Sequence, residues 1–102
     1  MKYLVLFKPE PSAPRLDDPL SANKAAVAYT ADMQKKGNLV AAFGFVGGGG
    51  IGILEAASHE ELWDLVYAYP LYSVFRWEVE PLVDVTHLFG RGIALLEQSA
   101  KK

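Results

Sequence analysis

The 102-residue sequence predicts an α+β domain in which two helices cover one face of a four-stranded sheet. Three observations support this prediction: the order of strand-like and helix-like segments, the residues that begin and end each helix, and one strand with strictly alternating side chains. The order is strand, helix, strand, strand, helix, strand, followed by a terminal helix. This is the split βαβ, or ferredoxin-like, arrangement, and right-handed crossovers place both main helices on the same face of the sheet.

The first strand and the first helix are separated by a proline-rich loop. Residues Lys2–Lys8 are mostly β-branched, aromatic or leucine, and Pro9 ends the strand because proline cannot donate a ladder hydrogen bond. The helix is expected to begin after Asp18, a suitable N-cap, with Pro19 in its first turn. It is expected to end at Gly37, which suits a left-handed C-cap.

The second and third strands are predicted to form a hairpin. Leu39–Val46 and Ile51–Ala57 flank the four-glycine turn Gly47–Gly50. A Ser-His-Glu-Glu capping box then begins the second helix at Ser58 and stabilises it by about 1 kcal/mol. Pro70 ends that helix.

The fourth strand has the clearest pattern in the chain. From Ser73 to Glu80, apolar and charged side chains alternate, which is typical of a strand with one buried and one polar face. The apolar positions are Phe75, Trp77 and Val79, and the charged positions are Arg76, Glu78 and Glu80. After this strand the sequence predicts a connector over Pro81–His87 and a short extra helix over Ile93–Ala100.

The first two strands are apolar on both faces, which predicts an association. Tyr3–Phe7 and Val40–Val46 contain almost no polar side chain, and such strands must be covered on both sides. Two helices cover only one side, so we expect a homodimer that stacks sheet against sheet, with Val5 or Phe43 or their neighbours in the interface. The terminal segment from Leu88 to Leu96 is too apolar for a free terminus, and we expect it to dock on the sheet edge or on another subunit.

Composition narrows the classes of function. The length predicts one domain over residues 1–102, and the net charge of −2 without a basic cluster does not predict nucleic-acid or membrane binding. The chain has no cysteine, which excludes disulfides and thiolate chemistry. No His, Asp and Glu set has metal-ligand spacing. No signal peptide or apolar run of about 20 residues is present, so a cytoplasmic protein without metal or cofactor is expected.

Three segments resemble the muconolactone isomerase family. They are the stretch with the capping serine, the break after the helix, and the last strand: Glu55–Asp64, Tyr69–Tyr72 and Trp77–Leu82. The resemblance implies a dimeric α+β barrel, assembled in the family into a ring of dimers. It also implies a cofactor-free proton shift that moves a double bond in a butenolide ring, and it carries the acidic position of the family's last strand onto Glu78. Monooxygenase-like and polyketide-tailoring members of the same barrel superfamily stay open by analogy of fold.

Glu78 and Arg76 are the candidate catalytic residues. They are two positions apart on one strand and therefore lie on the same face. Glu78 would act as a general base, and Arg76 would stabilise the negative charge of an enolate. The alternative is structural: an ion pair across the dimer seam, or a solvated sheet edge.

The aromatic side chains and one histidine are the candidate ligand-binding residues. A pocket for a small molecule is predicted to be lined by Tyr3, Phe7, Phe43 and Trp77, with His87 closing over the mouth of the barrel. The alternative is that the aromatic residues are ordinary core and His87 is an ordinary loop residue.

Three functions are compatible with these residues. The first is a cofactor-independent isomerase or cyclase that moves a proton on a small lactone, quinone or polyketide-like molecule. The second is a non-catalytic small-molecule binding protein, or an accessory protein of a natural-product pathway, on the same barrel. The third is a structural oligomer. A pocket with Arg76 or Glu78 in its wall would separate the first two from the third.

Overall fold

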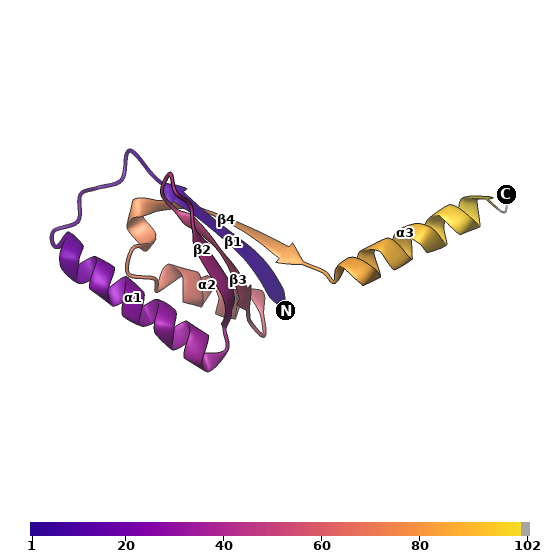
Figure 1. The fold of residues 1–102 in the computed structure, drawn as a ribbon, viewed down its shortest axis with the longest axis horizontal. Coiled ribbons are helices and arrows are strands. Elements are labelled where there is room, and N and C mark those ends of the chain that lie inside the picture. The colour runs from indigo at the N-terminus through magenta and orange to yellow at the C-terminus, as the bar shows by residue number, and fades with distance from the viewer. Residues whose placement is uncertain (101–102) are drawn as a thin grey trace.

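The computed structural model describes residues 1–100 and confirms the predicted order of elements (Figure 1). Two helices pack on a four-stranded antiparallel sheet, and a third helix follows the last strand. The elements are β1 (Lys2–Pro9), α1 (Pro19–Lys36), β2 (Leu39–Gly44), β3 (Gly50–Glu55), α2 (His59–Tyr67), the short 3-10 helix η1 (Tyr72–Val74), β4 (Phe75–Leu82) and α3 (Val85–Ala100). In this part of the chain, no helix has the length and apolar character needed to cross a membrane.

The sheet has the strand order β2-β3-β1-β4, so β1 is central and β4 is an edge strand. Val5 of β1 lies opposite Gly52 of β3 on one side and opposite Val79 of β4 on the other. This register places the odd residues of β1 and β4 on the same face. Helices α1 and α2 cover that face, and we call it the helix face and the other the open face.

The helix ends follow from the capping residues that the sequence predicts. A carboxylate oxygen of Asp18 accepts a hydrogen bond from the Ser21 N–H at 3.0 Å, and Gly37 ends α1 with a φ of +86°. The Ser58 hydroxyl accepts from the Glu61 N–H at 3.1 Å. These bonds satisfy amide groups that a helix leaves without an internal partner.

The core lies between the helix face and the two helices. It contains residues from β1, α1, β2, β3 and α2, and each is less than a tenth exposed: Tyr3, Val5, Met33, Leu39, Leu54, Ala56, Leu62 and Val66. The apolar stripes of the helices meet the apolar face of the sheet, as expected for a two-layer α+β domain.

Several boundaries differ from the sequence prediction. β3 is Gly50–Glu55 rather than Ile51–Ala57, α2 ends at Tyr67 before it reaches Pro70, and β4 begins at Phe75 rather than at Ser73. β2 ends at Gly44 rather than Val46, because the chain already turns at Phe45, whose N–H donates to the Gly49 carbonyl at 2.9 Å. The predicted connector over 81–87 is wrong, since α3 begins at Val85. Asp84 caps this helix: its carboxylate accepts from the Thr86 N–H at 2.8 Å.

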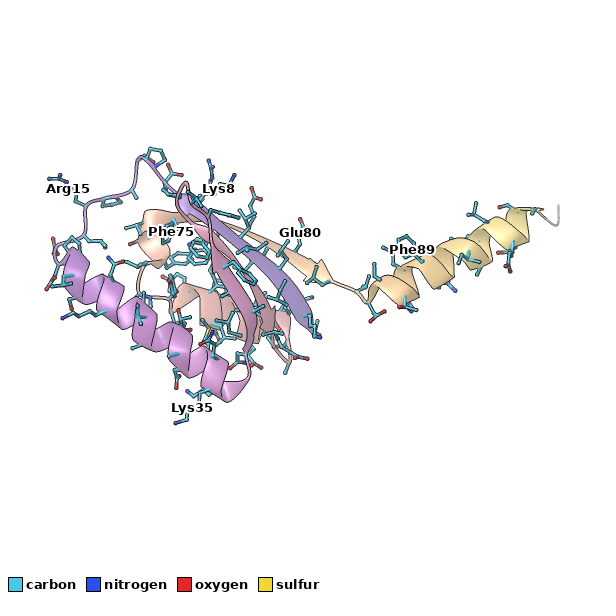
Figure 2. The ribbon with its side chains drawn as sticks, viewed as in Figure 1. Lys8, Arg15, Lys35, Phe75, Glu80 and Phe89 are labelled. Carbon is cyan, nitrogen blue, oxygen red and sulfur yellow. The ribbon has the colours of Figure 1, made fainter. Side chains whose placement is uncertain are left out.

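Helix α3 extends away from the sheet and gives the molecule a longest dimension of 65 Å (Figure 1). Every residue of α3 except Gly92 is exposed. Phe89 projects from it far from the other elements (Figure 2). The terminal helix is therefore longer than predicted and has no partner within its own chain.

Candidate functional site: an aromatic pocket between helices and sheet

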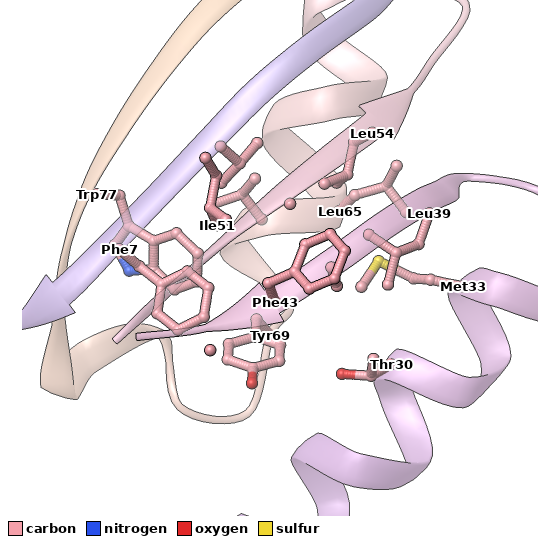
Figure 3. Close-up of a pocket in the computed structure, with 15 residues that line it drawn as sticks. Phe7, Thr30, Met33, Leu39, Phe43, Ile51, Leu54, Leu65, Tyr69 and Trp77 are labelled. Carbon is pink, nitrogen blue, oxygen red and sulfur yellow. The ribbon is translucent and has the colours of Figure 1, made fainter. Parts of the chain in front are cut away.

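The clearest candidate site is a pocket of about 240 Å³ on the helix face (Figure 3). Its walls come from β1, β2, β3, β4, α1 and the end of α2, so that nearly every element of the domain contributes. Four aromatic residues line it: Phe7, Phe43, Tyr69 and Trp77. Aliphatic residues complete the apolar lining: Val5, Met33, Leu39, Ala42, Leu54, Leu65 and Val66, with Ile51 at the edge that borders the other face of the sheet.

Glycines in the hairpin strands make room for this pocket. Gly44 of β2 and Gly52 of β3 line it and carry no side chain. A Cβ atom on Gly50 would lie 2.8 Å from the Phe7 ring, so the ring occupies the space that this glycine leaves. A Cβ atom on Gly52 would lie 3.2 Å from a methyl group of Leu54. Larger residues at these positions would therefore fill the pocket or displace its walls.

The aromatic rings form a connected cluster. The Phe7 and Trp77 rings lie 5.0 Å apart, and Trp77 and Tyr69 pack edge to face at 5.6 Å. Both separations lie in the range that aromatic pairs favour, and each pair contributes about 0.5–1.5 kcal/mol beyond the burial of its area. The cluster holds the pocket wall rigid and offers aromatic faces to a bound ring.

Three side chains bring polar atoms to the pocket lining: Thr30, Tyr69 and Trp77. The Trp77 indole N–H donates to the Tyr72 carbonyl at 3.0 Å, and the Thr30 hydroxyl donates to the Ala26 carbonyl at 2.9 Å. Burial raises the pKa of the Tyr69 hydroxyl, and hydrogen bonding with Thr30 partly offsets that effect. Tyr69 thus stays protonated at neutral pH and is the polar group best suited to bind a carbonyl oxygen of a ligand.

Arg76 and Glu78 lie on the open face, opposite the pocket. In the register, Glu78 is beside Leu6 and Arg76 is beside Lys8. Trp77 points into the helix layer, and its two neighbours therefore point away from it. Both charged side chains are exposed. Within residues 1–100 a single ion pair is present, between Lys36 Nζ and Asp32 Oδ2 at 2.9 Å. Arg76 and Glu78 therefore form no ion pair with each other.

The open face is apolar next to these charges. Leu4, Leu6, Ile51 and Ile53 are half-buried there and form a band across β1 and β3. Glu80 points from the same face, on the side away from Phe75 (Figure 2). The two-sided apolar character of β1 that the sequence indicates is therefore present in the structure.

The structure brings together three of the five predicted ligand-binding residues: Phe7, Phe43 and Trp77. Tyr3 is instead 2% exposed, and its hydroxyl lies 2.5 Å from Nδ1 of His59, on the side of α2 away from this pocket. His87 is exposed in the first turn of α3 and lies apart from the pocket. The sequence prediction did not single out Tyr69 or Thr30. Tyr69 lies two residues beyond the end of α2, and its place just before Pro70 was the available signal.

The fold and the pocket define an α+β domain with an apolar pocket between its helices and its sheet. More specifically, the chain belongs to the muconolactone delta-isomerase family, whose model matches residues 1–87. No curated protein matches the sequence.

Two solved structures share the fold, each with a TM-score of 0.68. One is a 5-chloro-2-hydroxyhydroquinone dehydrochlorinase from Burkholderia phenoliruptrix AC1100 in complex with 2,5-dihydroxybenzoquinone. It is 21% identical, and the match covers 85% of this chain and 98% of that one. The other is a muconolactone isomerase that is 20% identical, with 82% of this chain and 90% of that chain covered.

Proposed function

We propose that this chain is a cofactor-independent isomerase that binds a small, planar ring molecule in the aromatic pocket and changes it by proton transfer. The observation that carries the proposal is the pocket itself: four aromatic residues surround about 240 Å³ of apolar space, with the Tyr69 hydroxyl at its wall. Membership of the muconolactone delta-isomerase family supports an isomerase over the other classes. A lactone, quinone or polyketide-like ring has the required shape and polarity.

In this proposal the ring stacks on the aromatic wall and its carbonyl oxygen accepts a hydrogen bond from Tyr69. Stacking uses the face of Trp77, whereas Phe43 is 72% exposed, lies opposite Ile51 in the register and only borders the pocket from the open-face side. A protonated tyrosine can stabilise an enolate oxygen as negative charge develops on it, while a solvent water at the pocket rim accepts the ring proton and a proton from solvent is returned to another ring carbon. The raised pKa of Tyr69 keeps it protonated throughout the neutral range.

Glu78 and Arg76 provide a second proposed location for the chemistry, on the open face. There Glu78 would remove a proton from a carbon next to a carbonyl group, Arg76 would stabilise the enolate, and Glu78 would return the proton to another carbon. The specific observation in favour is the apolar band beside these charges, which a second copy would cover in a sheet-to-sheet dimer. Because the sheet lies between Glu78 and the aromatic pocket, one bound ligand cannot contact both sites.

Deuterium incorporation distinguishes the two locations. Muconolactone is incubated with enzyme in D₂O, and the exchange of ring protons is followed by NMR. We expect Tyr69→Phe to slow exchange about 100- to 10,000-fold, in line with typical general acid–base contributions, and Glu78→Gln to leave it unchanged. The reverse result would move the chemistry to the open face. Saturable binding without exchange in the wild-type protein would overturn the isomerase proposal and support the non-catalytic binding protein.

A further inference from the structure

A second cavity lies between α2 and β4, and we call it the second groove. Its volume is about 640 Å³, compared with about 240 Å³ for the aromatic pocket. Sites for small molecules usually measure about 300–1,000 Å³, so the second groove has room for a larger molecule than the aromatic pocket has. Its lining comes from β1, α2, η1 and β4 and includes Tyr3, His59, Leu62, Trp63, Tyr72 and Val79.

The lining of the second groove includes a hydrogen-bonded pair, Tyr3 and His59. Tyr3 is 2% exposed, and its hydroxyl lies 2.5 Å from Nδ1 of His59. The centroids of the two rings are 5.6 Å apart, in an edge-to-face arrangement. His59 itself is exposed. Because a buried hydroxyl without a partner is costly, this bond holds the imidazole ring in place against the rigid core.

The bond to Tyr3 engages one ring nitrogen of His59 and leaves the other for a ligand. Within residues 1–100, His59 makes its side-chain hydrogen bond through Nδ1 alone. The Tyr3 hydroxyl can donate its proton to the Met1 sulfur atom at 3.7 Å, and the Tyr3 oxygen can then accept from Nδ1–H. In that arrangement Nε2 carries a lone pair and can accept a hydrogen bond from a hydroxyl group.

Aromatic rings lie next to this pair. Trp63 is four residues after His59 on α2, so both side chains lie on the same side of the helix, about 6 Å apart along its axis. Trp63 is 56% exposed. From η1 and β4, the rings of Tyr72 and Trp77 stack at 5.8 Å with an interplanar angle of 12°. A flat ring system can therefore pack against aromatic rings while its polar group reaches His59.

The charges around the second groove favour a neutral polar group on the ligand. Among the described residues, those that line the groove include no lysine or arginine. The exposed carboxylates of Glu60 and Asp64 follow His59 and Trp63 directly in α2. A carboxylate or phosphate on the ligand would be repelled there, whereas a hydroxyl group would not.

We propose that the second groove binds a flat hydroxyaromatic molecule of two or three fused rings. Its hydroxyl group donates to Nε2 of His59, and its rings pack against Trp63 and Tyr72. Two fused rings cover the one helical turn from His59 to Trp63, whereas a single ring leaves much of the 640 Å³ without contacts. Tyr3 is a positioning residue, because it holds the imidazole ring and does not contact the ligand hydroxyl.

This site is separate from the aromatic pocket of the proposed function. The two cavities share Val66 and Trp77, whereas Tyr3, His59 and Trp63 line only the second groove. The proposal does not rest on the proposed reaction, since binding is measured without turnover. Gly52→Val narrows the aromatic pocket alone and should leave binding in the second groove unchanged.

Two matched probes test the role of His59. They are 2-naphthol and 2-methoxynaphthalene, which has the same rings but no hydroxyl proton. Each is titrated into ¹⁵N-labelled protein, and the Trp63 indole signal, assigned through Trp63→Phe, is followed. We expect 2-naphthol to bind about tenfold more tightly, as one hydrogen bond contributes. His59→Phe should abolish this preference, and His87→Phe, the control at an exposed histidine of α3, should keep it.

Tyr3→Phe tests the positioning role, because it keeps the buried ring and removes only the hydroxyl. We expect it to lower the preference for 2-naphthol about threefold and to leave the affinity for 2-methoxynaphthalene unchanged. A structural effect alone would weaken both probes equally.

Three results would overturn the proposal. They are equal affinities for the two probes in the wild-type protein, a preference for 2-naphthol that survives His59→Phe, and 2-naphthol binding that does not shift the Trp63 signal. Loss of 2-naphthol binding in Gly52→Val would place the molecule in the aromatic pocket and would also contradict it.

Discussion

The two faces of the sheet differ in cover, charge and depth. On the helix face, Phe75 and Trp77 pack among aromatic rings, and the pocket lies beside them. On the open face, Arg76, Glu78 and Glu80 alternate with the same residues but contact no helix and form no ion pair with one another. The same strand therefore supplies the wall of an enclosed pocket and the charges of an uncovered surface. Sequence alternation assigns residues to faces, but the helices decide which face encloses a cavity.

The largest expected difference between the faces is in stability. Leu54 on the helix face is 5% exposed, whereas Leu6 on the open face is half-buried. Leu54→Ala should lower the free energy of unfolding by about 2–5 kcal/mol, because it leaves a cavity in the core. Leu6→Ala should lower the free energy of unfolding by less than Leu54→Ala does, at concentrations where the chain is monomeric. Urea denaturation of both variants measures these two losses of free energy.

The same pair tests the sheet-to-sheet dimer. If a second copy covers the open face, the cost of Leu6→Ala should rise with protein concentration, while the cost of Leu54→Ala should not. Equal and concentration-independent costs would show that the open face is not an interface.

The next effect concerns the pocket. Gly52→Val should weaken binding of 2,5-dihydroxybenzoquinone at least tenfold, since even a Cβ atom there lies 3.2 Å from the Leu54 side chain. Gly90→Ala in α3 is the matched control, because a Cβ atom there meets nothing within 4 Å. Isothermal titration calorimetry gives both affinities. Unchanged binding in Gly52→Val would place the ligand outside the pocket.

A moderate effect is expected at alkaline pH. Burial raises the pKa of Tyr69 above its ordinary value of 10.0, and burial and then the charge of Asp32 raise the pKa of Tyr29. The unfolded chain therefore loses these protons first. The contribution of these two tyrosines to the free energy of unfolding should be fully present below about pH 10. It should be lost as the pH rises towards their pKa values in the folded protein. Tyr69→Phe should flatten that fall, and the double variant with Tyr29→Phe should flatten it further. A decline of equal slope in all three proteins would contradict the assignment.

The smallest effect should come from a helix cap. Ser58→Ala removes the acceptor of the Glu61 N–H and should cost about 1 kcal/mol in unfolding free energy. Asp84→Ala removes the corresponding cap of α3 and should lower helicity without changing the stability of the sheet. Circular dichroism and thermal melts separate the two results.

The fold could be predicted from the sequence because each boundary has a local cause. Asp18 and Ser58 cap helices, and glycine or proline ends them. The start of α3 differs from the prediction, since the expected helix begins only at Ile93, whereas α3 begins at Val85 and includes Gly90 and Gly92. Glycine costs a helix only about 1 kcal/mol at each position.

The site could be predicted only in part. Alternation placed Trp77 inward, and Phe7 is its direct neighbour in the register. Tyr3 does not line the aromatic pocket, since it is four residues from Phe7 along β1, about 13 Å away, but it lines the second groove between α2 and β4 together with Trp77. Tyr69 lies after the end of α2, where its direction depends on the path of the chain before Pro70 and not on helical periodicity.

In the proposed function the ligand binds on the helix face. The chain has two tryptophans: Trp77 lines both the aromatic pocket and the second groove between α2 and β4, whereas Trp63 lines only that groove. A ¹H–¹⁵N titration with 2,5-dihydroxybenzoquinone, with indole signals assigned through Trp63→Phe, follows each one. We expect a saturable shift of the Trp77 signal without a shift of the Trp63 signal, and we expect Gly52→Val to weaken it and Glu78→Gln to leave it unchanged. A shift that survives Gly52→Val and disappears in Glu78→Gln would contradict it.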